Sequence, residues 1–140
     1  MEIIRDKIIG ENGTRRIVLV ADRLTLSRRR WRGMAEDGRD FGFDLEEPLP
    51  DGAVFFRDGD SLYAIAQRPE PLLEIAIRDG REGARLGWMI GNLHLPIEPG
   101  EGAAFTLDDP SARKLFQREA VSFTSVSKVF HPLAASTHGH

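Results

Sequence analysis

Cysteine is absent from this chain of 140 residues. Its absence excludes disulfide bridges, thiolate metal ligands and a cysteine nucleophile. Long apolar runs are also missing, because the longest interior stretch without Asp, Glu, Lys or Arg begins at Leu86 and ends before Glu98. A membrane-spanning helix needs about 20 such residues, so the sequence predicts none. The first residues contain no apolar core of a signal peptide, and we therefore expect a cytoplasmic protein.

A large excess of charge is lacking as well. The formal net charge is −3 and the pI is near 5.8, whereas domains that bind nucleic acid are usually strongly basic. The sequence also lacks a Gly-x-Ser-x-Gly nucleophile motif, a phosphate-binding loop and a His-Glu-x-x-His zinc motif. Without any of these motifs, we expect the chain not to be an enzyme.

Residues 1–68 show the pattern of an all-β domain. Arg16–Val20 is apolar and rich in β-branched residues, Leu24–Leu26 begins a second strand-like run, and residues 41–45 alternate in polarity. Such alternation is typical of strands with one buried face. The dipeptide Asp37-Gly38 lies between these runs and is typical of a hairpin turn. The sequence therefore predicts a small antiparallel sandwich with no helix.

A second domain is expected at residues 69–130. Residues 67–71, Gln-Arg-Pro-Glu-Pro, contain two prolines that should interrupt a strand, so they are predicted to form a linker. Beyond them, a helix is predicted to begin after Asp79, to be capped reciprocally by Glu82, and to end near Asn92. The predicted order is βαββαβ, which is typical of a ferredoxin-like fold. The whole chain is thus expected to be an α+β protein.

Two glycines, Gly87 and Gly91, lie four residues apart in the predicted helix and therefore on one face. Glycines allow another backbone to approach closely. Their role is either to pack the helix on its own sheet or to form a contact between subunits.

Residues 131–140 show no periodicity and are expected to form a flexible tail. Three of the chain's four histidines lie here, at His131, His138 and His140. Neutral imidazole binds Ni(II), Zn(II) and Cu(II) well, and a short His-rich tract is one signature of a metal site. A terminal tail that binds nothing can have the same composition, so both interpretations stay open on this pattern alone.

The run Leu-Gly-Trp-Met-Ile-Gly-Asn-Leu-His-Leu-Pro at residues 86–96 resembles the signature of the UreE family of urease accessory proteins. In that family a helix ends in Gly-Asn-Arg-His, followed one residue later by Pro. Residues 37–45 are similar to the family's N-terminal hairpin, and Leu-Pro-Asp-Gly at 49–52 is similar to the turn after it. Phe-His-Pro at 130–132 and the closing His-Gly-His are similar to its C-terminal ending. The resemblance covers about residues 15–140.

The resemblance implies a homodimeric nickel metallochaperone that delivers Ni(II) to apo-urease with the UreG GTPase. It implies that residues 1–68 are similar to the peptide-binding domain of Hsp40-type chaperones. It also implies that His94 binds metal together with its symmetry mate at the dimer axis. His138 and His140 match the family's C-terminal ligands, and His131 is a further candidate. Ni(II) is the expected ion, with Zn(II) or Cu(II) as alternatives in the same site.

Leu93 departs from the family pattern, because it stands where the family has Arg. Any contact made by that Arg is therefore absent from this chain. Without the family, His94 itself has a simpler interpretation as a helix-terminal histidine that interacts favourably with the helix dipole.

The segment Arg28–Arg32, Arg-Arg-Arg-Trp-Arg, points to an alternative function. It is either a solvated edge strand or a surface that contacts an acidic protein surface or nucleic acid. A small partner-binding module is accordingly the alternative to a metallochaperone.

Overall fold

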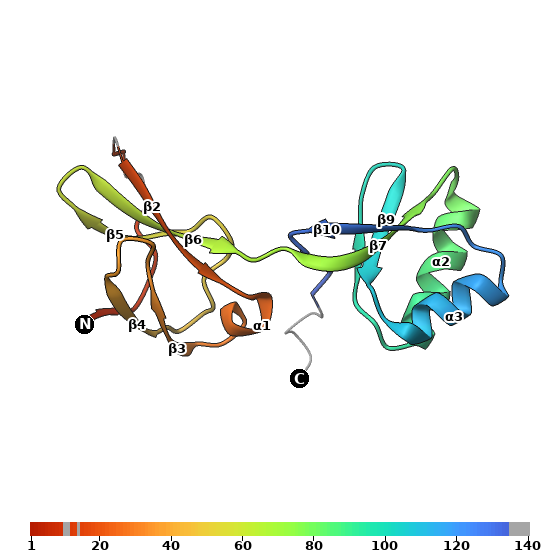
Figure 1. Cartoon of the computed structure of the whole chain (residues 1–140), viewed down its shortest axis with the longest axis horizontal. Coiled ribbons are helices and arrows are strands. Elements are labelled where there is room, and N and C mark those ends of the chain that lie inside the picture. Colours follow the sequence, from red (N-terminus) through yellow and green to blue (C-terminus); the bar gives the residue numbers. More distant parts are fainter. Residues whose placement is uncertain (10–11, 14, 135–140) are drawn as a thin grey trace. The chain divides into compact units, whose positions relative to one another are not determined.

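The computed structural model describes residues 1–9, 12–13 and 15–134. The chain divides into two compact units, with the boundary between Arg68 and Pro69. Figure 1 shows helices together with several sheets, in agreement with the predicted α+β class.

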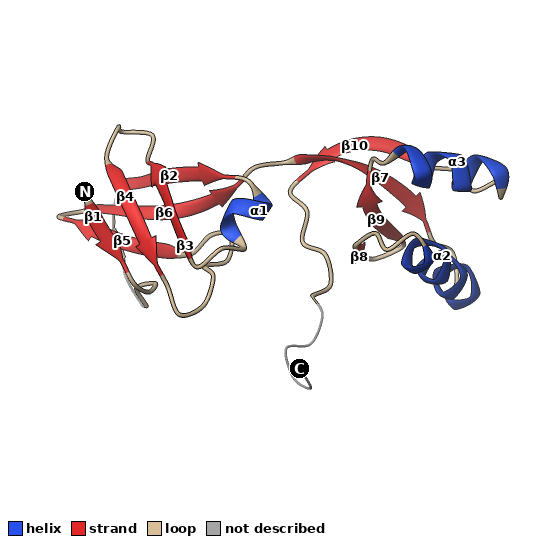
Figure 2. Ribbon diagram, turned by 90° about the horizontal axis from the view of Figure 1, so that it is seen from below, coloured by secondary structure: helices blue, strands red, loops and turns tan. Residues whose placement is uncertain are grey.

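The first unit is built almost entirely from strands. Its described elements are β1 (Glu2–Ile4), β2 (Arg15–Ala21), α1 (Arg23–Leu26), β3 (Arg30–Met34), β4 (Asp40–Asp44), β5 (Val54–Asp58) and β6 (Ser61–Gln67). They form two three-stranded sheets, with the strand orders β1-β4-β3 and β2-β6-β5. Figure 2 shows these strands in red beside the single turn of α1.

Aromatic side chains fill the core of the first unit. Trp31 of β3 stacks on Phe43 of β4, with ring centroids 4.0 Å apart. Phe41 is fully buried and meets Phe55 of β5 edge to face at 5.0 Å. Phe41 also meets Tyr63 of β6 at 5.2 Å. The two contacts of Phe41 join the inner faces of the two sheets, whereas the Trp31–Phe43 stack lies within one sheet.

The prediction of an antiparallel sandwich was wrong for two strand pairs of the first unit. β1 pairs with β4, and β2 pairs with β6, in parallel. Alternation along a strand indicates which face is buried but not which strand lies beside it, so the pattern did not reveal these pairings. The hairpin between β3 and β4 is antiparallel as predicted, with Gly38 in its turn at a φ of 89°.

The prediction of strand structure at Leu24–Leu26 was also wrong, because these residues belong to helix α1. The Thr25 N–H donates to Asp22 Oδ1 at 2.7 Å, which caps the first turn. A helix of four residues is too short to show the apolar spacing that identifies longer helices. The available signal was the spacing of three residues between Asp22 and Thr25, which is typical of an N-cap.

The second unit combines a four-stranded sheet with two helices. Its described elements are β7 (Glu70–Ala76), α2 (Gly80–Asn92), β8 (Ile97–Pro99), β9 (Ala103–Leu107), α3 (Pro110–Arg118) and β10 (Thr124–Lys128). The strand order is β10-β7-β9-β8, and every neighbouring pair is antiparallel.

Both long helices cover the same face of this sheet (Figure 1). The core between them contains buried side chains from β7, β9, α2 and α3, namely Leu73, Ile75, Leu86, Met89, Ile90, Ala104, Ala112 and Phe116. The buried residues of α2 recur at spacings of three and four, as predicted for an amphipathic helix.

The predicted linker at residues 67–71 is shorter than expected. β6 continues to Gln67 and β7 begins at Glu70. Pro71 pairs with Ser127 near the start of β7, and its carbonyl accepts the Asp108 N–H at 3.2 Å. Proline near the beginning of a strand loses only its own N–H while its fixed φ remains compatible with an extended chain.

The predicted start of α2 is confirmed, but the capping is not reciprocal. Asp79 is the N-cap and accepts the Glu82 N–H at 2.9 Å. The Glu82 carboxylate binds Arg78 instead of the Asp79 N–H, accepting the Arg78 N–H at 3.3 Å and its guanidinium at 2.7 Å. A nearby Arg offers the carboxylate a charged partner that a neutral N–H does not.

Candidate metal centre

His94 lies directly after the C-terminus of α2, where the backbone adopts a left-handed conformation. Leu93 is the C-cap, and His94 has a φ of 57°. The His94 N–H donates to the Gly91 carbonyl at 3.0 Å, and the Leu95 N–H donates to the Ile90 carbonyl at 3.3 Å. These two bonds form a Schellman motif, in which the left-handed position is usually glycine.

This backbone geometry holds an exposed imidazole at the helix end. His94 is solvent-exposed, whereas Leu93 and Leu95 on either side are half-buried against the core. Pro96 follows and cannot continue the helix. A side chain other than glycine in the left-handed region costs about 1 kcal/mol or more. Sequence reasoning placed His94 at the helix end but did not reveal this φ.

Leu93, which stands where the resembled family has Arg, has a structural role in this chain. Its side chain packs against the same hydrophobic core as Leu95 and Ile97. An apolar residue at this position therefore covers the core rather than presenting a positive charge beside His94.

His131 lies after the fully buried Phe130 and is itself exposed. Its backbone N–H donates to Glu98 Oε1 at 2.6 Å, and the Leu133 N–H donates to the Ile97 carbonyl at 2.9 Å. The structure thus attaches this segment to β8, the strand that begins three residues after His94.

Glu98 is a part-buried carboxylate near these candidates that sequence reasoning missed. Its side chain is 15% exposed and forms an ion pair with Lys128 at 2.5 Å. Burial disfavours the charged form, but the Lys128 ammonium and the His131 N–H outweigh it and hold the pKa of Glu98 below its usual value. Glu98 and Lys128 are thirty residues apart, and nothing in the sequence pattern connects them.

The two remaining candidate ligands, His138 and His140, lie outside the described residues. Within the described ranges, no three side chains of His, Asp or Glu come together in a group that could hold a metal ion. The described part of one chain therefore places both His94 and the segment at His131 next to strand β8. It does not supply a complete set of metal ligands.

The outward face of α2 is open. A Cβ added at Gly87 or at Gly91 would meet no atom within 4 Å. Trp88, beside them, is 68% exposed. These glycines therefore do not pack the helix on its own sheet, which removes one of the two roles that the sequence allowed.

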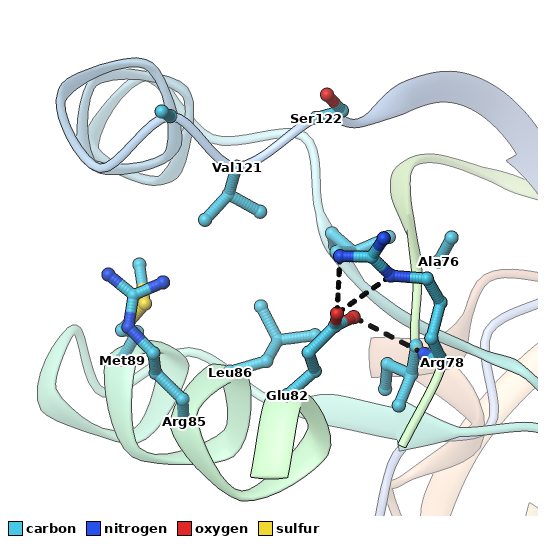
Figure 3. Close-up of a pocket in the computed structure, with 11 residues that line it drawn as sticks. Ala76, Arg78, Glu82, Arg85, Leu86, Met89, Val121 and Ser122 are labelled. Atoms are coloured by element: carbon cyan, nitrogen blue, oxygen red, sulfur yellow. Dashed lines mark hydrogen bonds and ion pairs between the residues drawn. The ribbon is translucent and has the colours of Figure 1, made fainter. Parts of the chain in front are cut away.

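A hollow of about 400 Å³ lies at the opposite end of α2, around its first turns. In Figure 3, the Glu82 carboxylate points toward Arg78 at one side of this hollow, and Leu86 and Val121 supply part of its apolar wall. The Arg78 guanidinium lowers the pKa of Glu82. No described histidine lines the hollow, so it is separate from the helix end that carries His94.

No helix within the described ranges has both the length and the apolar character needed to cross a membrane.

Comparison with known proteins places this arrangement in a family. Residues 70–140 match the family model described as UreE urease accessory protein, C-terminal domain. The urease accessory protein UreE of Rhizobium meliloti is 31% identical over 99 residues, which are 69% of this chain and 64% of that protein. The UreE of Chelativorans sp. is 28% identical over 124 residues, which are 87% of this chain and 78% of that protein.

The same name belongs to a protein of Azotobacter vinelandii that is 30% identical over 109 residues, covering 76% of this chain and 66% of that protein. The chain thus spans between 64% and 78% of the length of these relatives. Because the family model covers residues 70–140, half of the sequence, the chain belongs to the UreE family of urease accessory proteins.

Proposed function

We propose that this chain is a cytoplasmic nickel metallochaperone of urease maturation, which carries Ni(II) to apo-urease together with the UreG GTPase. Membership of the UreE family supports a role in urease maturation. The observation that carries the nickel proposal is the exposed imidazole of His94, held by a left-handed backbone at the end of α2. Zn(II) and Cu(II) are alternative ions for the same site.

The chemistry of the proposed site suits a carrier, which has to release its cargo. The chain has no cysteine, so the ligands are imidazoles rather than thiolates, which bind soft metals more firmly. His94 is the proposed principal ligand, and His138 and His140 of the tail are proposed to add to it, with His131 as a further candidate. Tail ligands can leave the ion one at a time during transfer.

A homodimer is the proposed assembly, with its axis near His94. One imidazole cannot hold Ni(II), whereas two chains meeting at a twofold axis would supply two copies of His94. The open face of α2 around Gly87, Trp88 and Gly91 supports this proposal. The two glycines have no side chains to hold a second helix away, and the exposed indole of Trp88 offers that helix an apolar contact.

The two units are proposed to have different functions, one in metal binding and the other in partner binding. Residues 69–130 are proposed to be a ferredoxin-like metal-binding domain, a proposal supported by the order βαββαβ and the strand order β10-β7-β9-β8. Residues 131–140 are proposed to be its His-containing tail. Residues 1–68 are proposed to be a peptide- or partner-binding domain of the Hsp40 type.

Calorimetric titration with Ni(II), combined with light scattering, tests the proposal. We expect one tight Ni(II) site per two chains and a dimer in solution. Gly87→Leu should disrupt the dimer and weaken Ni(II) binding while the chain stays folded, since the added side chain points into open space. Gln117→Leu, at an exposed position of α3, is the matched control and should change neither the dimer nor the Ni(II) affinity. A wild-type chain that stays monomeric and binds no Ni(II) would overturn the proposal.

A second candidate function, contact with an acidic partner protein, is favoured by the outer face of the sheet β1-β4-β3. Arg30 and Arg32 are exposed there, and Met34 is 59% and Ile3 49% exposed. Trp31 is buried in the core at 9% exposure, so the basic run offers no aromatic ring for stacking on a nucleic-acid base. Arg30 forms an ion pair with Asp44 of β4 at 3.1 Å, so the face combines apolar side chains with partly neutralised positive charge. Such a face suits an acidic protein surface better than nucleic acid.

Replacing Arg30 and Arg32 together by Glu tests this candidate. We expect weaker association with the urease maturation proteins and unchanged Ni(II) affinity. An electrophoretic shift series over increasing salt should show no nucleic-acid complex, because phosphate contacts would give a steep salt dependence.

A further inference from the structure

The pairing of β7 with β10 ends before β7 does. The last residues that pair are Glu74 and Thr124, whereas β7 continues to Ala76. The same register would place Ser122 opposite Ala76, but β10 begins only at Thr124. The sheet therefore has an opening here, between the end of β7 and the segment that leads into β10.

Ala76 directs its backbone groups into this opening. The Ile77 N–H donates to the Gly102 carbonyl at 2.9 Å, on the side of β9. Successive residues of an antiparallel strand direct their N–H and C=O groups to opposite sides, so those of Ala76 point away from β9. Among the described residues, no backbone hydrogen bond crosses the opening to them. A free donor and acceptor at a sheet edge can pair with another extended chain.

A hollow lies on each face of the sheet at this opening, and Ala76 and Ser122 line both. The hollow of about 400 Å³ lies on the face that the helices cover. Figure 3 shows its apolar side chains Leu86 and Met89 across the open space from Val121. The hollow on the other face has a volume of about 330 Å³. Because side chains of a strand alternate between faces, a chain in the opening would have space for both sets.

The two hollows differ in charge. The described charged residues that line the larger one are Arg78, Glu82 and Arg85. Glu82 pairs with Arg78 at 2.6 Å, whereas Arg85 meets Glu119 at 3.2 Å, and that carboxylate is shared with Arg118 at 3.6 Å. Exposed pairs of this kind are weak, so Arg85 can bind a further carboxylate. Among the described residues that line the smaller hollow, Glu74 alone is charged, which suits a cation.

We propose that the opening between β7 and β10 binds an extended segment of a partner protein by strand addition at Ala76. The partner residue opposite Ala76 lies on the same face, beside Glu74, and is basic. The residues before and after it enter the larger hollow, where one is apolar against Leu86 and the other is acidic near Arg85. This docking surface belongs to the second unit and depends neither on Ni(II) binding nor on the role proposed for residues 1–68.

Nuclear magnetic resonance of the isotope-labelled full chain tests the proposal, with the peptide acetyl-Ala-Leu-Lys-Glu-Ala-amide as the probe. Leu and Glu of this probe share one face of a strand, and Lys lies on the other. We expect saturable shifts at the amides of Ala76, Leu86 and Ser122. The control acetyl-Ala-Leu-Glu-Lys-Ala-amide has the same composition but turns its Glu toward Glu74, so it should bind about tenfold more weakly.

Two variants test the backbone contact and the charge separately. Ala76→Pro removes the N–H proposed to donate to the probe, while the β7–β9 hydrogen bonds stay intact, and should weaken binding by about tenfold. Arg85→Glu should weaken it by about three- to tenfold. Arg81→Glu, at an exposed position of the same helix outside the lining, is the matched control and should have a smaller effect. Unchanged amide shifts at Leu73 and Ile90 in each variant show that the second unit is folded.

Preference for the first probe, reduced in both variants, would support the proposal. No saturable shift with the first probe would overturn it, and so would equal binding of the two probes, because the alternation of side chains would then not matter. Full binding by Ala76→Pro would overturn strand addition and leave a side-chain pocket. Shifts at Ala76 that depend on protein concentration without any probe would show a second copy of this chain in the opening, and would overturn the partner segment.

Discussion

The ends of the two long helices, α2 and α3, have the same backbone and different side chains. His94 follows α2 with a φ of 57°, and Ala120 follows α3 with a φ of 56°. After α3, the Ala120 N–H donates to the Gln117 carbonyl at 3.3 Å and the Val121 N–H donates to the Phe116 carbonyl at 2.8 Å. Both helices thus end in a Schellman motif without glycine.

The comparison shows that a left-handed residue at a helix end is not in itself a sign of function here. The difference lies in what surrounds it. The C-terminal half of α2 exposes Trp88 and Gly91, whereas the C-terminal half of α3 exposes Lys114 and Arg118. Of these two helix ends, that of α2 joins an exposed imidazole to an exposed indole ring and a glycine without neighbours, and this is the combination on which the proposed dimer rests.

Exchanging the two side chains should have the largest effect. We expect His94→Ala to lower Ni(II) affinity by at least about a hundredfold, roughly 2.8 kcal/mol. Adding Ala120→His to that variant places an imidazole in the same backbone geometry at the other helix end and should restore nothing. Calorimetry at fixed pH measures both. Recovery of tight binding in the double variant would show that the helix-end geometry is sufficient, and that the surroundings of His94 do not matter.

Removal of residues 137–140 should have the next largest effect. The deletion takes away His138 and His140, and we expect affinity to fall by about ten- to a hundredfold, or roughly 1.4–2.8 kcal/mol. The loss should be smaller than for His94→Ala because tail ligands lose conformational entropy when they bind. The same titration decides the order, and a deletion as harmful as His94→Ala would contradict it.

Glycine at either helix end should stabilise the fold. His94→Gly and Ala120→Gly each relieve a left-handed side chain, and we expect a gain of about 0.5–1 kcal/mol in the free energy of unfolding. Urea unfolding measures the gain, with Ala84→Gly in the middle of α2 as a control that should be destabilising. Only His94→Gly should also lose Ni(II) binding. A destabilising Ala120→Gly would mean that its methyl group contributes packing that outweighs the strain.

The smallest expected effect concerns pH at the start of α3. The side chain and the N–H of Ser111 lower the pKa of Asp109 from 3.8. A lowered pKa means that Asp109 contributes stability at pH values above 3.8, and that this contribution is lost as pH falls through the lower folded value. Asn also caps helices, so Asp109→Asn should keep the helix and flatten the acid side of the stability profile. Thermal unfolding between pH 2.5 and 7 checks this, and parallel profiles for both chains would contradict it.

Local signals in the sequence were sufficient where one residue determines the structure around it. Asp79 predicted the start of α2, and Gly38 predicted the hairpin between β3 and β4. The parallel pairing of β1 with β4 was not predictable, since the same alternation suits several neighbours. Helix α1 was too short to show a period.

The candidate site was predictable only in part for the same physical reason. His94 lies in a motif of adjacent residues, so the sequence placed it at a helix end. Glu98 accepts hydrogen bonds from Lys128 and from the His131 N–H, which the fold brings to it from about thirty residues away. Contacts of that kind depend on the sheet order, and a charge pattern along one strand does not reveal them.

The parallel pairing of β2 with β6 has a consequence for folding during synthesis on the ribosome. Arg15 pairs with Ser61, which follows it by 46 residues. At the usual 5–20 residues per second of synthesis, β2 waits roughly 2 to 9 s for its partner to be made. During that time β2 has no partner strand for its backbone hydrogen bonds, because β6 is its neighbour in the sheet. We therefore expect the first unit to depend most on ribosome-associated chaperones, and slower elongation at Ser61–Gln67 to increase its aggregation.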